Sequence, residues 1–372
     1  MWIGVDASRA ARAWRTGTEN YSLYLIRALA AQGERHRFRL YFNEPPAEGL
    51  LARDERIEWR IMPFPRLWTH ARLSYEMICQ PPDVLFVPAH VLPIVHPRRS
   101  VVTIHDVGYL RYPQMHPRAS RLYLDWSTRW NVRAAAHLVA DSEATREDLI
   151  RFYRADPAKI TVAYPAGTPG LAPVEDEARL AEVRARYGTG EAYFLYVGTL
   201  QPRKNLGALL EAYARLLARG QLPKEVRLVL AGRPGWLCEG ILARAHQADL
   251  AGQVILPGYV ATEDLAALLS GALAFVFPSW YEGFGLPVLE AMICGAPVIA
   301  SNTSSLPEVV GDAALLINPA EVEDLAQAMV RLYDDEALRK DLSRRGRERA
   351  RAFSWEACAA RVLTVLEAVG EG

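Results

Sequence analysis

The sequence is poor in cysteine and carries no excess of either charge. Its four cysteines, Cys79, Cys238, Cys294 and Cys358, form neither a C-x-x-C pair nor a cluster with histidine, which argues against a zinc knuckle and a disulfide framework. The 43 Lys and Arg residues equal the 43 Asp and Glu residues in number, so no overall charge attracts a polyanion. A D-x-D triplet, typical of metal-bridged diphosphate sites, is also missing. We therefore predict no nucleic-acid partner and no metal site.

Long apolar runs are missing as well. No stretch of eighteen apolar residues occurs, and the N-terminus MWIGVDASRAARAW lacks the apolar core of a signal peptide, so we predict a cytoplasmic protein. The aromatic and basic stretch at residues 63–75 has two interpretations. It either contacts lipid headgroups at the inner face of the membrane, or it starts a helix that packs on its own domain, which we favour as the commoner case. The sequence predicts no oligomeric state.

Short apolar runs typical of buried strands alternate with segments of helical spacing along the whole chain. The composition, 51% apolar and 23% charged, is that of a globular protein. The predicted strands are residues 2–6, 38–42, 57–62, 84–87, 101–104, 137–140 and 159–164, and then 193–197, 226–232, 254–256, 274–277, 298–300 and 314–317. This alternation predicts an α/β protein with an open parallel sheet in each half.

A Pro- and Gly-rich segment at residues 164–177 separates the two halves and is predicted to be a linker. The 372 residues are enough for two domains, each with its own core. We place the first domain at residues 1–167 and the second at 176–352. Helical spacing runs from residue 321 to 369 with an interruption near Phe353, so the last helix is predicted at 355–369.

The stretch from residue 275 to 311 carries the strongest candidate site. A strand at 274–277 breaks at a proline, and a loop then leads into a predicted helix at 286–294. Glu282 lies in the loop and Glu290 in the helix, with seven residues between them. Such carboxylates either accept hydrogen bonds from ribose or sugar hydroxyls or are ordinary loop and surface acids. The backbone N–H groups at the start of this helix can hold an anion. They belong to Gly283, Phe284, Gly285 and Leu286.

Two cations follow the first strand of the second half. The strand at 193–197 runs into GTLQPRKNL, which places Arg203 and Lys204 ahead of a predicted helix at 206–217. A basic pair between a strand and a helix is suited to clamp a diphosphate. The alternative is a solvated basic pair in a loop.

In the first half, polar residues follow two strands. His105 and Asp106 end the run VVTIHD, at the edge of the sheet where ligands of open α/β folds bind. His105 either serves a ligand or is only satisfied by a neighbouring carboxylate such as Asp106. Asp141 and Ser142 could cap a helix at 143–154. A strand at 2–6, a loop with Gly17 and a helix at 19–31 form a weaker candidate for a phosphate cradle.

The E-x7-E pattern within EGFGLPVLEAMICGAPVIAS closely resembles the signature of family 4 glycosyltransferases, and TIHD, DSEAT and VGTLQPRKNL extend the resemblance over nearly the whole chain. The resemblance implies a retaining enzyme with the GT-B fold, in which two Rossmann-like domains face each other across an interdomain cleft. The first domain takes the acceptor and the second takes the nucleotide sugar. The terminal helix at 355–369 is expected to cross back onto the first domain.

The resemblance also implies roles for the candidate residues. Glu282 lies at the transferred sugar, His105 on the acceptor side, and Lys204 joins them as the third catalytic residue because it faces the leaving diphosphate. Glu290 holds the ribose of the nucleotide.

Further donor contacts are implied around these residues. Arg203 completes the phosphate clamp, Gly17 contacts the diphosphate, and the loop of Tyr259 contacts the base. Two positions depart from the family pattern: Thr199 stands where an arginine is usual, and Gly17 lacks the second glycine of the usual pair.

Within the family, the motifs are most similar to those of bacterial mannosyltransferases that build surface polysaccharides. This implies transfer of mannose from GDP-mannose to a glycan or lipid-linked glycan, with the nucleotide sugar as co-substrate and no resident cofactor. Two alternatives remain, a nucleotide-sugar epimerase of the same fold and a non-catalytic nucleotide-sugar-binding protein. A pyridoxal-phosphate phosphorylase is disfavoured because none of Lys204, Lys224 and Lys340 lies in a matching context.

Overall fold

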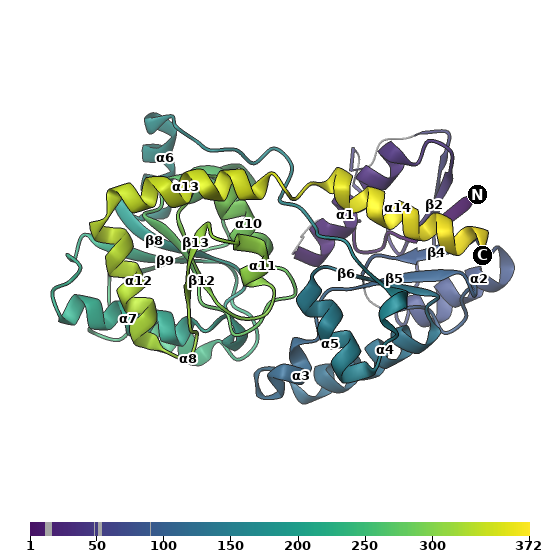
Figure 1. Ribbon diagram of the computed structural model, residues 1–372, viewed down its shortest axis with the longest axis horizontal. Coiled ribbons are helices and arrows are strands. Elements are labelled where there is room, and N and C mark those ends of the chain that lie inside the picture. The colour runs from purple at the N-terminus through teal and green to yellow at the C-terminus, as the bar shows by residue number, and fades with distance from the viewer. Residues whose placement is uncertain (12–16, 48, 51–53, 90) are drawn as a thin grey trace. The chain divides into compact units, whose positions relative to one another are not determined.

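The computed structural model describes residues 1–11, 17–47, 49–50, 54–89 and 91–372. These residues divide into two compact units. The first comprises Met1–Leu110, Arg118–Ala166 and Phe353–Gly372, and the second comprises Arg111–Pro117 and Gly167–Ala352. Each unit is built around one parallel sheet with helices packed on it, so the α/β prediction is confirmed (Figure 1).

In the described part of the first unit, the sheet has seven strands in the order β3-β2-β1-β4-β5-β6-β7. Its strands are β1 (Trp2–Asp6), β2 (Arg37–Phe42), β3 (Ile57–Ile61), β4 (Val84–Val87), β5 (Ser100–Ile104), β6 (His137–Ala140) and β7 (Ile160–Val162). All neighbours pair in parallel. Every residue of β4 and β5 is buried, which explains why β4 appears in the sequence as an unbroken apolar run and why β5 has only two small polar residues, Ser100 and Thr103.

Among the described residues, six α-helices accompany this sheet, including one from the far end of the chain. They are α1 (Gly17–Gln32), α2 (Ser74–Cys79), α3 (Gly108–Arg111), α4 (Arg118–Ala134), α5 (Glu143–Tyr153) and α14 (Trp355–Glu371), with a π-helix at Thr69–Leu73 and a 3-10 turn at Pro157–Lys159. Helix α14 packs against α1 (Figure 1). Its first residue, Trp355, is buried, with its ring centroid 5.8 Å from that of Tyr21. The terminal helix therefore contributes to the core of the first unit.

The aromatic and basic stretch at residues 63–75 is divided between core and surface. Trp68 and Leu73 are buried, whereas Phe64, Leu67 and Tyr75 are exposed. The buried residues anchor the stretch on its own unit, as the favoured interpretation expected. Within the part of the chain that the structure describes, no helix is long and apolar enough to cross a bilayer.

The sheet of the second unit has six strands in the order β10-β9-β8-β11-β12-β13. These are β8 (Ala192–Val197), β9 (Val226–Ala231), β10 (Val254–Gly258), β11 (Ala274–Phe277), β12 (Val298–Ser301) and β13 (Ala314–Ile317). They also pair in parallel throughout. All six were predicted from their apolar runs.

The helices of the second unit alternate with its strands. They are α6 (Glu177–Tyr187), α7 (Leu206–Ala218), α8 (Glu239–Ala245), α9 (Thr262–Ser270), α10 (Leu286–Ile293), α11 (Leu306–Val310), α12 (Val322–Asp334) and α13 (Glu336–Ala350), with 3-10 turns at Pro113–Met115 and Pro202–Lys204. The sequence predicted no break between α12 and α13. The break occurs at Asp335, which has extended backbone angles and accepts a hydrogen bond from the Leu338 N–H at 2.8 Å as the N-cap of α13.

Each sheet reverses its strand order at one point. Successive strands are added in one direction from β1 and from β8, and the chain then returns to the other side with β4 and with β11. Loops at the carboxyl ends of the strands diverge at such a switch point and leave a crevice that binds ligands in open α/β sheets. In the second unit, the loops that leave β8 and β11 carry the predicted basic pair and Glu282, and the second predicted carboxylate, Glu290, lies in the helix α10 that follows the β11 loop.

Candidate functional site

The loops that follow β8 and β11 meet through three charged side chains. Lys204 Nζ lies 2.7 Å from Glu282 Oε1, and a guanidinium nitrogen of Arg203 lies 3.2 Å from Glu282 Oε2. The backbone joins the same loops, because the Trp280 N–H donates to the Arg203 carbonyl at 2.9 Å. The Lys204 ammonium also lies 5.0 Å from the centre of the Phe277 ring. The sequence predicted a sugar-binding carboxylate and a phosphate clamp as separate parts, whereas the structure makes them one cluster.

This cluster is buried and positive overall. Glu282 is 6% exposed and Lys204 8% exposed, so each charge needs a partner at close range. Burial alone would raise the pKa of Glu282, but Arg203 and Lys204 outweigh it and hold the pKa below its ordinary value. One carboxylate faces two cations, which leaves a net positive charge beside the start of helix α10. Such a site favours an anionic ligand.

The loop ahead of α10 has the form of an anion cradle. Gly285 has φ 108°, in a left-handed conformation, and a Cβ there would lie 2.7 Å from Leu306 Cδ2. The Ser305 hydroxyl donates to the carbonyls of Glu282 and Phe284 at 3.0 and 2.8 Å and so fixes the turn. No described residue accepts a hydrogen bond from the N–H of Gly285 or Leu286. These N–H groups begin α10 at its positive end.

Glu290 lies one turn further along α10. Its Oε1 accepts two hydrogen bonds from Thr168, one from the hydroxyl at 2.6 Å and one from the backbone N–H at 3.2 Å. Burial raises the pKa of Glu290, and these two donors only partly counter it. The sequence identified Glu290 but not its partner, because Thr168 is 122 residues away along the chain.

Two further predicted positions follow β10 and β8, which lie on either side of β9 in the second sheet. Tyr259 follows β10, is 47% exposed, and has the Arg233 guanidinium 5.2 Å from its ring centre. Thr199, which replaces the family's usual arginine, follows β8, and its carbonyl accepts a hydrogen bond from the Tyr196 hydroxyl at 3.1 Å. Arg233, on the loop after β9, therefore places a cation beside Tyr259, whereas position 199 carries none.

In the first unit, His105 is paired with a buried aspartate. Its Nδ1 lies 2.6 Å from Asp141 Oδ2. The neighbouring Asp106, which the sequence suggested as partner, instead accepts a hydrogen bond from the Gly108 N–H at 2.9 Å. Burial alone would lower the pKa of His105, but the Asp141 carboxylate outweighs it and raises the pKa above its ordinary value. Of the two predicted cap residues, only Ser142 caps α5: its side chain accepts a hydrogen bond from the Thr145 N–H.

Two groups of the first unit were not singled out from the sequence, Tyr21 beside His105 and Asp6 at the end of β1. The Tyr21 ring lies edge-on to the imidazole with centroids 4.8 Å apart. Asp6, at the end of β1, accepts from the Ser8 N–H through Oδ1, whereas its buried Oδ2 has no hydrogen-bond partner among the described residues. Burial raises the pKa of Asp6 to about 6. Asp6 ends the buried strand β1, so a search for polar residues at the ends of buried strands would have found it.

Gly17 is the exposed first residue of α1. The preceding Arg15 and Thr16, which complete its predicted phosphate loop, lie outside the described residues.

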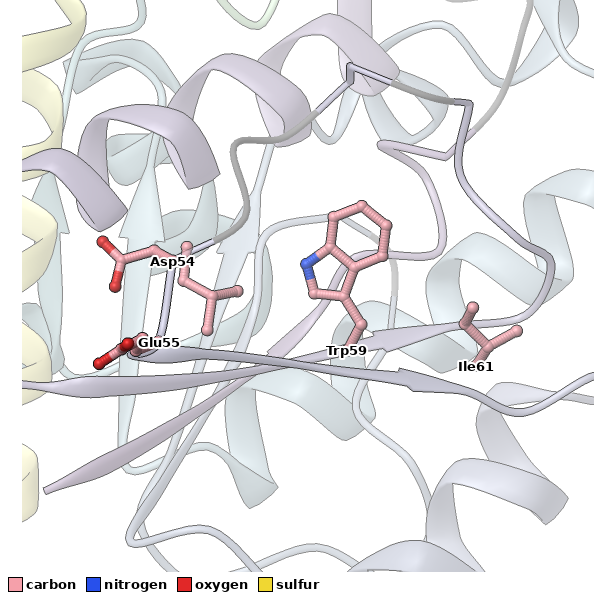
Figure 2. A pocket seen from close by; sticks show the side chains of 5 residues that line it. Asp54, Glu55, Trp59 and Ile61 are labelled. Carbon is pink, nitrogen blue, oxygen red and sulfur yellow. The ribbon is translucent and has the colours of Figure 1, made fainter.

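Two hollows occur away from these residues. One, of about 530 Å³, follows edge strand β3 and is lined by Asp54, Glu55, Ile57, Trp59 and Ile61 (Figure 2). The other, of about 470 Å³, is lined in part by the segments that precede β8, β11 and β12. It therefore lies at the amino ends of these strands, whereas Glu282 lies at the carboxyl ends. Neither contains a predicted site residue. Across the described ranges, no group of three or more His, Cys, Asp or Glu side chains is arranged to hold a metal ion.

Comparison with solved structures identifies the fold class. Sucrose-phosphate synthase from Thermosynechococcus elongatus superposes with a TM-score of 0.76 at 23% identity, over 99% of this chain and 98% of that chain. Both units of the present chain, each with a Rossmann-type sheet, take part in this match. The fold is therefore the GT-B fold, and the site lies at the strand edge where open α/β folds bind ligands.

Sequence comparisons identify the family. Residues 15–166 match the model for Glycosyltransferase Family 4, and residues 182–349 match that for Glycosyl transferases group 1. O-antigen chain mannosyltransferase B of Escherichia coli is 30% identical over 378 residues, covering 94% of this chain and 95% of the relative. MMP alpha-(1->4)-mannosyltransferase of Mycolicibacterium hassiacum is 39% identical over 170 residues, covering 45% of this chain and 40% of the relative. The chain belongs to the family 4 glycosyltransferases, and it is an enzyme of that class.

Proposed function

We propose that this glycosyltransferase moves mannose from GDP-mannose, with retention of anomeric configuration, onto a glycan or lipid-linked glycan during surface polysaccharide synthesis. The observation that carries the proposal is the cluster of Arg203, Lys204 and Glu282 beside the start of α10. The choice of mannose is supported by the full-length similarity to an O-antigen chain mannosyltransferase.

The reaction breaks the bond between the anomeric carbon and the diphosphate oxygen, whose electron pair stays with the departing GDP. A bond then joins the anomeric carbon to the acceptor oxygen, and the proton of that hydroxyl leaves with the diphosphate or to solvent. Negative charge grows on the diphosphate as the sugar acquires oxocarbenium character. Lys204, Arg203 and the N–H groups that begin α10 are the groups available to stabilise it.

Glu282 has two parts in this proposal. Its carboxylate accepts hydrogen bonds from hydroxyls of the donor sugar. Before the donor binds, its ion pairs keep Lys204 and Arg203 in place. A diphosphate that contacts these cations takes over part of the charge compensation now supplied by Glu282. The cations and the helix start offset the charge of the leaving group without a metal, so we propose a metal-independent reaction with no resident cofactor.

His105 is proposed to act on the acceptor side. Its pair with Asp141 fixes the imidazole at the carboxyl edge of the first sheet. Contact of residues 63–75 with the inner face of a membrane, and a cytoplasmic location, stay predictions of the sequence. Similarity to full-length transferases disfavours the two alternatives, an epimerase and a non-catalytic binding protein.

Calorimetric titration in the presence of EDTA tests the donor assignment. GDP and GDP-mannose are expected to bind more tightly than UDP, ADP and the corresponding glucose conjugates. Selective binding of UDP or ADP would overturn the GDP assignment. Incubation with GDP-mannose alone should leave the sugar unchanged, and conversion to another hexose without an acceptor would instead support the epimerase.

A further inference from the structure

Thr168 holds the carboxylate of Glu290 from one side. Both of its hydrogen bonds, from the hydroxyl at 2.6 Å and from the backbone N–H at 3.2 Å, end on Oε1. No other residue in the described part of the chain hydrogen-bonds to this carboxylate. Oε2 is therefore left as the acceptor with a fixed direction, since two donors on one oxygen restrain rotation of the carboxylate.

The backbone that presents Thr168 is itself tightly packed. Gly167 lies against α10, and a Cβ at this position would overlap Ile293 Cδ1 and lie 3.6 Å from Glu290 Cγ. A side chain at this position would therefore force the end of Ile293 to move, whereas glycine lets the chain pass close to the helix without any shift. Glycine at 167 and threonine at 168 together bring two donors to Glu290.

We propose that Thr168 is a positioning residue for nucleotide binding: it holds Glu290 so that Oε2 accepts a hydrogen bond from a ribose hydroxyl of the nucleotide. This inference rests on the proposed role of Glu290 at the ribose. It assigns part of the ribose affinity to a residue at the start of the segment Gly167–Ala352 of the second unit, outside the E-x7-E motif.

The same contact favours the charged form of Glu290. An ionised carboxylate only accepts hydrogen bonds, as a ribose diol requires, whereas a protonated one must donate at one oxygen. Burial acts against ionisation, and the hydroxyl and N–H of Thr168 act for it. Loss of the hydroxyl therefore affects both the orientation and the ionisation of Glu290.

A calorimetric comparison of two nucleotides tests the proposal. Wild-type protein is titrated with GDP and with 2′,3′-dideoxy-GDP, which lacks the ribose hydroxyls, and the titrations are repeated with Thr168→Val, Thr168→Ser and Thr364→Val. Valine keeps the shape and the backbone donor but removes the hydroxyl. Thr364→Val is the matched control, because Thr364 is an exposed residue of α14 whose hydroxyl only donates to the Ala360 carbonyl.

The expected pattern is specific to the ribose. Wild type should bind GDP at least about tenfold more tightly than the dideoxy form, the amount typical of a hydrogen bond to a charged group. Thr168→Val should lose most of this difference by weakening GDP alone, Thr168→Ser should restore it, and Thr364→Val should keep it. Thermal unfolding midpoints close to that of wild type would show that the variants fold.

Other outcomes separate the two proposals. If Thr168→Val weakens both nucleotides equally, or neither, Thr168 does not position Glu290. If wild type itself fails to distinguish the two nucleotides, the ribose role of Glu290 is overturned together with this inference. If UDP binds in place of GDP, the donor base is wrong, and UDP with 2′,3′-dideoxy-UDP then tests Thr168 in the same way. Binding of none of these nucleotides would overturn both proposals.

Discussion

The imidazole of His105 and the carboxylate of Asp141 face each other at 2.6 Å because their strands are in register. Ile104, the last residue of β5, is the pairing partner of Ala140, the last residue of β6. The next residue on each strand is His105 and Asp141, respectively. A histidine and an aspartate that are 36 residues apart in sequence therefore leave the sheet side by side.

We expect Asp141→Asn to lower the pKa of His105. The Asp141 carboxylate stabilises the imidazolium and raises this pKa above 6.5, against the effect of burial. The protonated pair thus contributes stability below pH 6.5 that is lost as the pH rises through the folded-state pKa. Histidine-selective ¹H–¹⁵N NMR over a pH titration measures the change. Asp106→Asn is the control, and it should lower the pKa of His105 by a smaller amount. An unchanged His105 pKa in Asp141→Asn would contradict the assignment of Asp141 as its partner.

Lys204→Ala should lower the turnover of the proposed mannosyl transfer by at least about tenfold, which corresponds to about 1.4 kcal/mol in the barrier. The variant removes one of two cations available to the leaving diphosphate and leaves Glu282 paired with Arg203 alone. Steady-state kinetics with GDP-mannose measure the loss. Lys224→Ala, at an exposed lysine before β9, should match wild type. Full activity in Lys204→Ala would contradict the proposed role of Lys204 at the diphosphate.

Gly285→Ala should weaken nucleotide binding, whereas Gly220→Ala should not. Both glycines have positive φ, 108° and 66° respectively, so alanine strains the backbone at each site. Only at Gly285 does a Cβ also meet a neighbour, Leu306 Cδ2 at 2.7 Å, and only there does the turn begin α10. Urea unfolding should show a loss of about 1 kcal/mol in each variant. Calorimetry should show weaker GDP binding in Gly285→Ala alone, and equal GDP affinity in the two variants would count against the cradle.

Asp6→Asn should stabilise the protein, and more so at pH 8 than at pH 5. Burial raises the pKa of Asp6 from 3.8 to about 6, so ionisation costs stability that increases between these two values and stays constant above them. At about 1.4 kcal/mol per pKa unit, the full cost is about 3 kcal/mol. Asparagine keeps an oxygen for the Ser8 N–H without the charge. Urea unfolding at the two pH values checks this, with the exposed Asp312→Asn as control, and an equal gain at both would exclude ionisation as the cause.

The strands were predictable because each is a local pattern. Ala274–Phe277 and Val84–Val87 are buried on both faces, so every residue is apolar and the run is visible without knowledge of its neighbours. The break at Asp335 was missed because helical spacing continues through it, and the cap depends on one side-chain hydrogen bond. Among the predicted site residues, Glu282, Glu290, Arg203 and Lys204 could be proposed from sequence because they lie within motifs close to a strand or helix boundary.

Partnerships between residues were not predictable in the same way. Lys204 and Glu282 are 78 residues apart, and they meet only because β8 and β11 are neighbours at the switch point of the second sheet. The partner of His105 was expected at Asp106, the adjacent residue, but the side chains of consecutive residues in an extended segment point to opposite faces. Asp141, on the neighbouring strand, faces His105 instead.

The sequence by itself determined the positions of the strands along the chain, the α/β class, the family and the charged residues of the predicted site in the second unit. These follow from apolar periodicity and from short motifs, which act over a few residues. The tertiary structure alone decided that Glu282 neutralises part of the charge of Lys204 and Arg203, that Asp141 holds His105, and that Thr168 holds Glu290. Strand order and register set these contacts, and both arise from packing between segments distant in the chain.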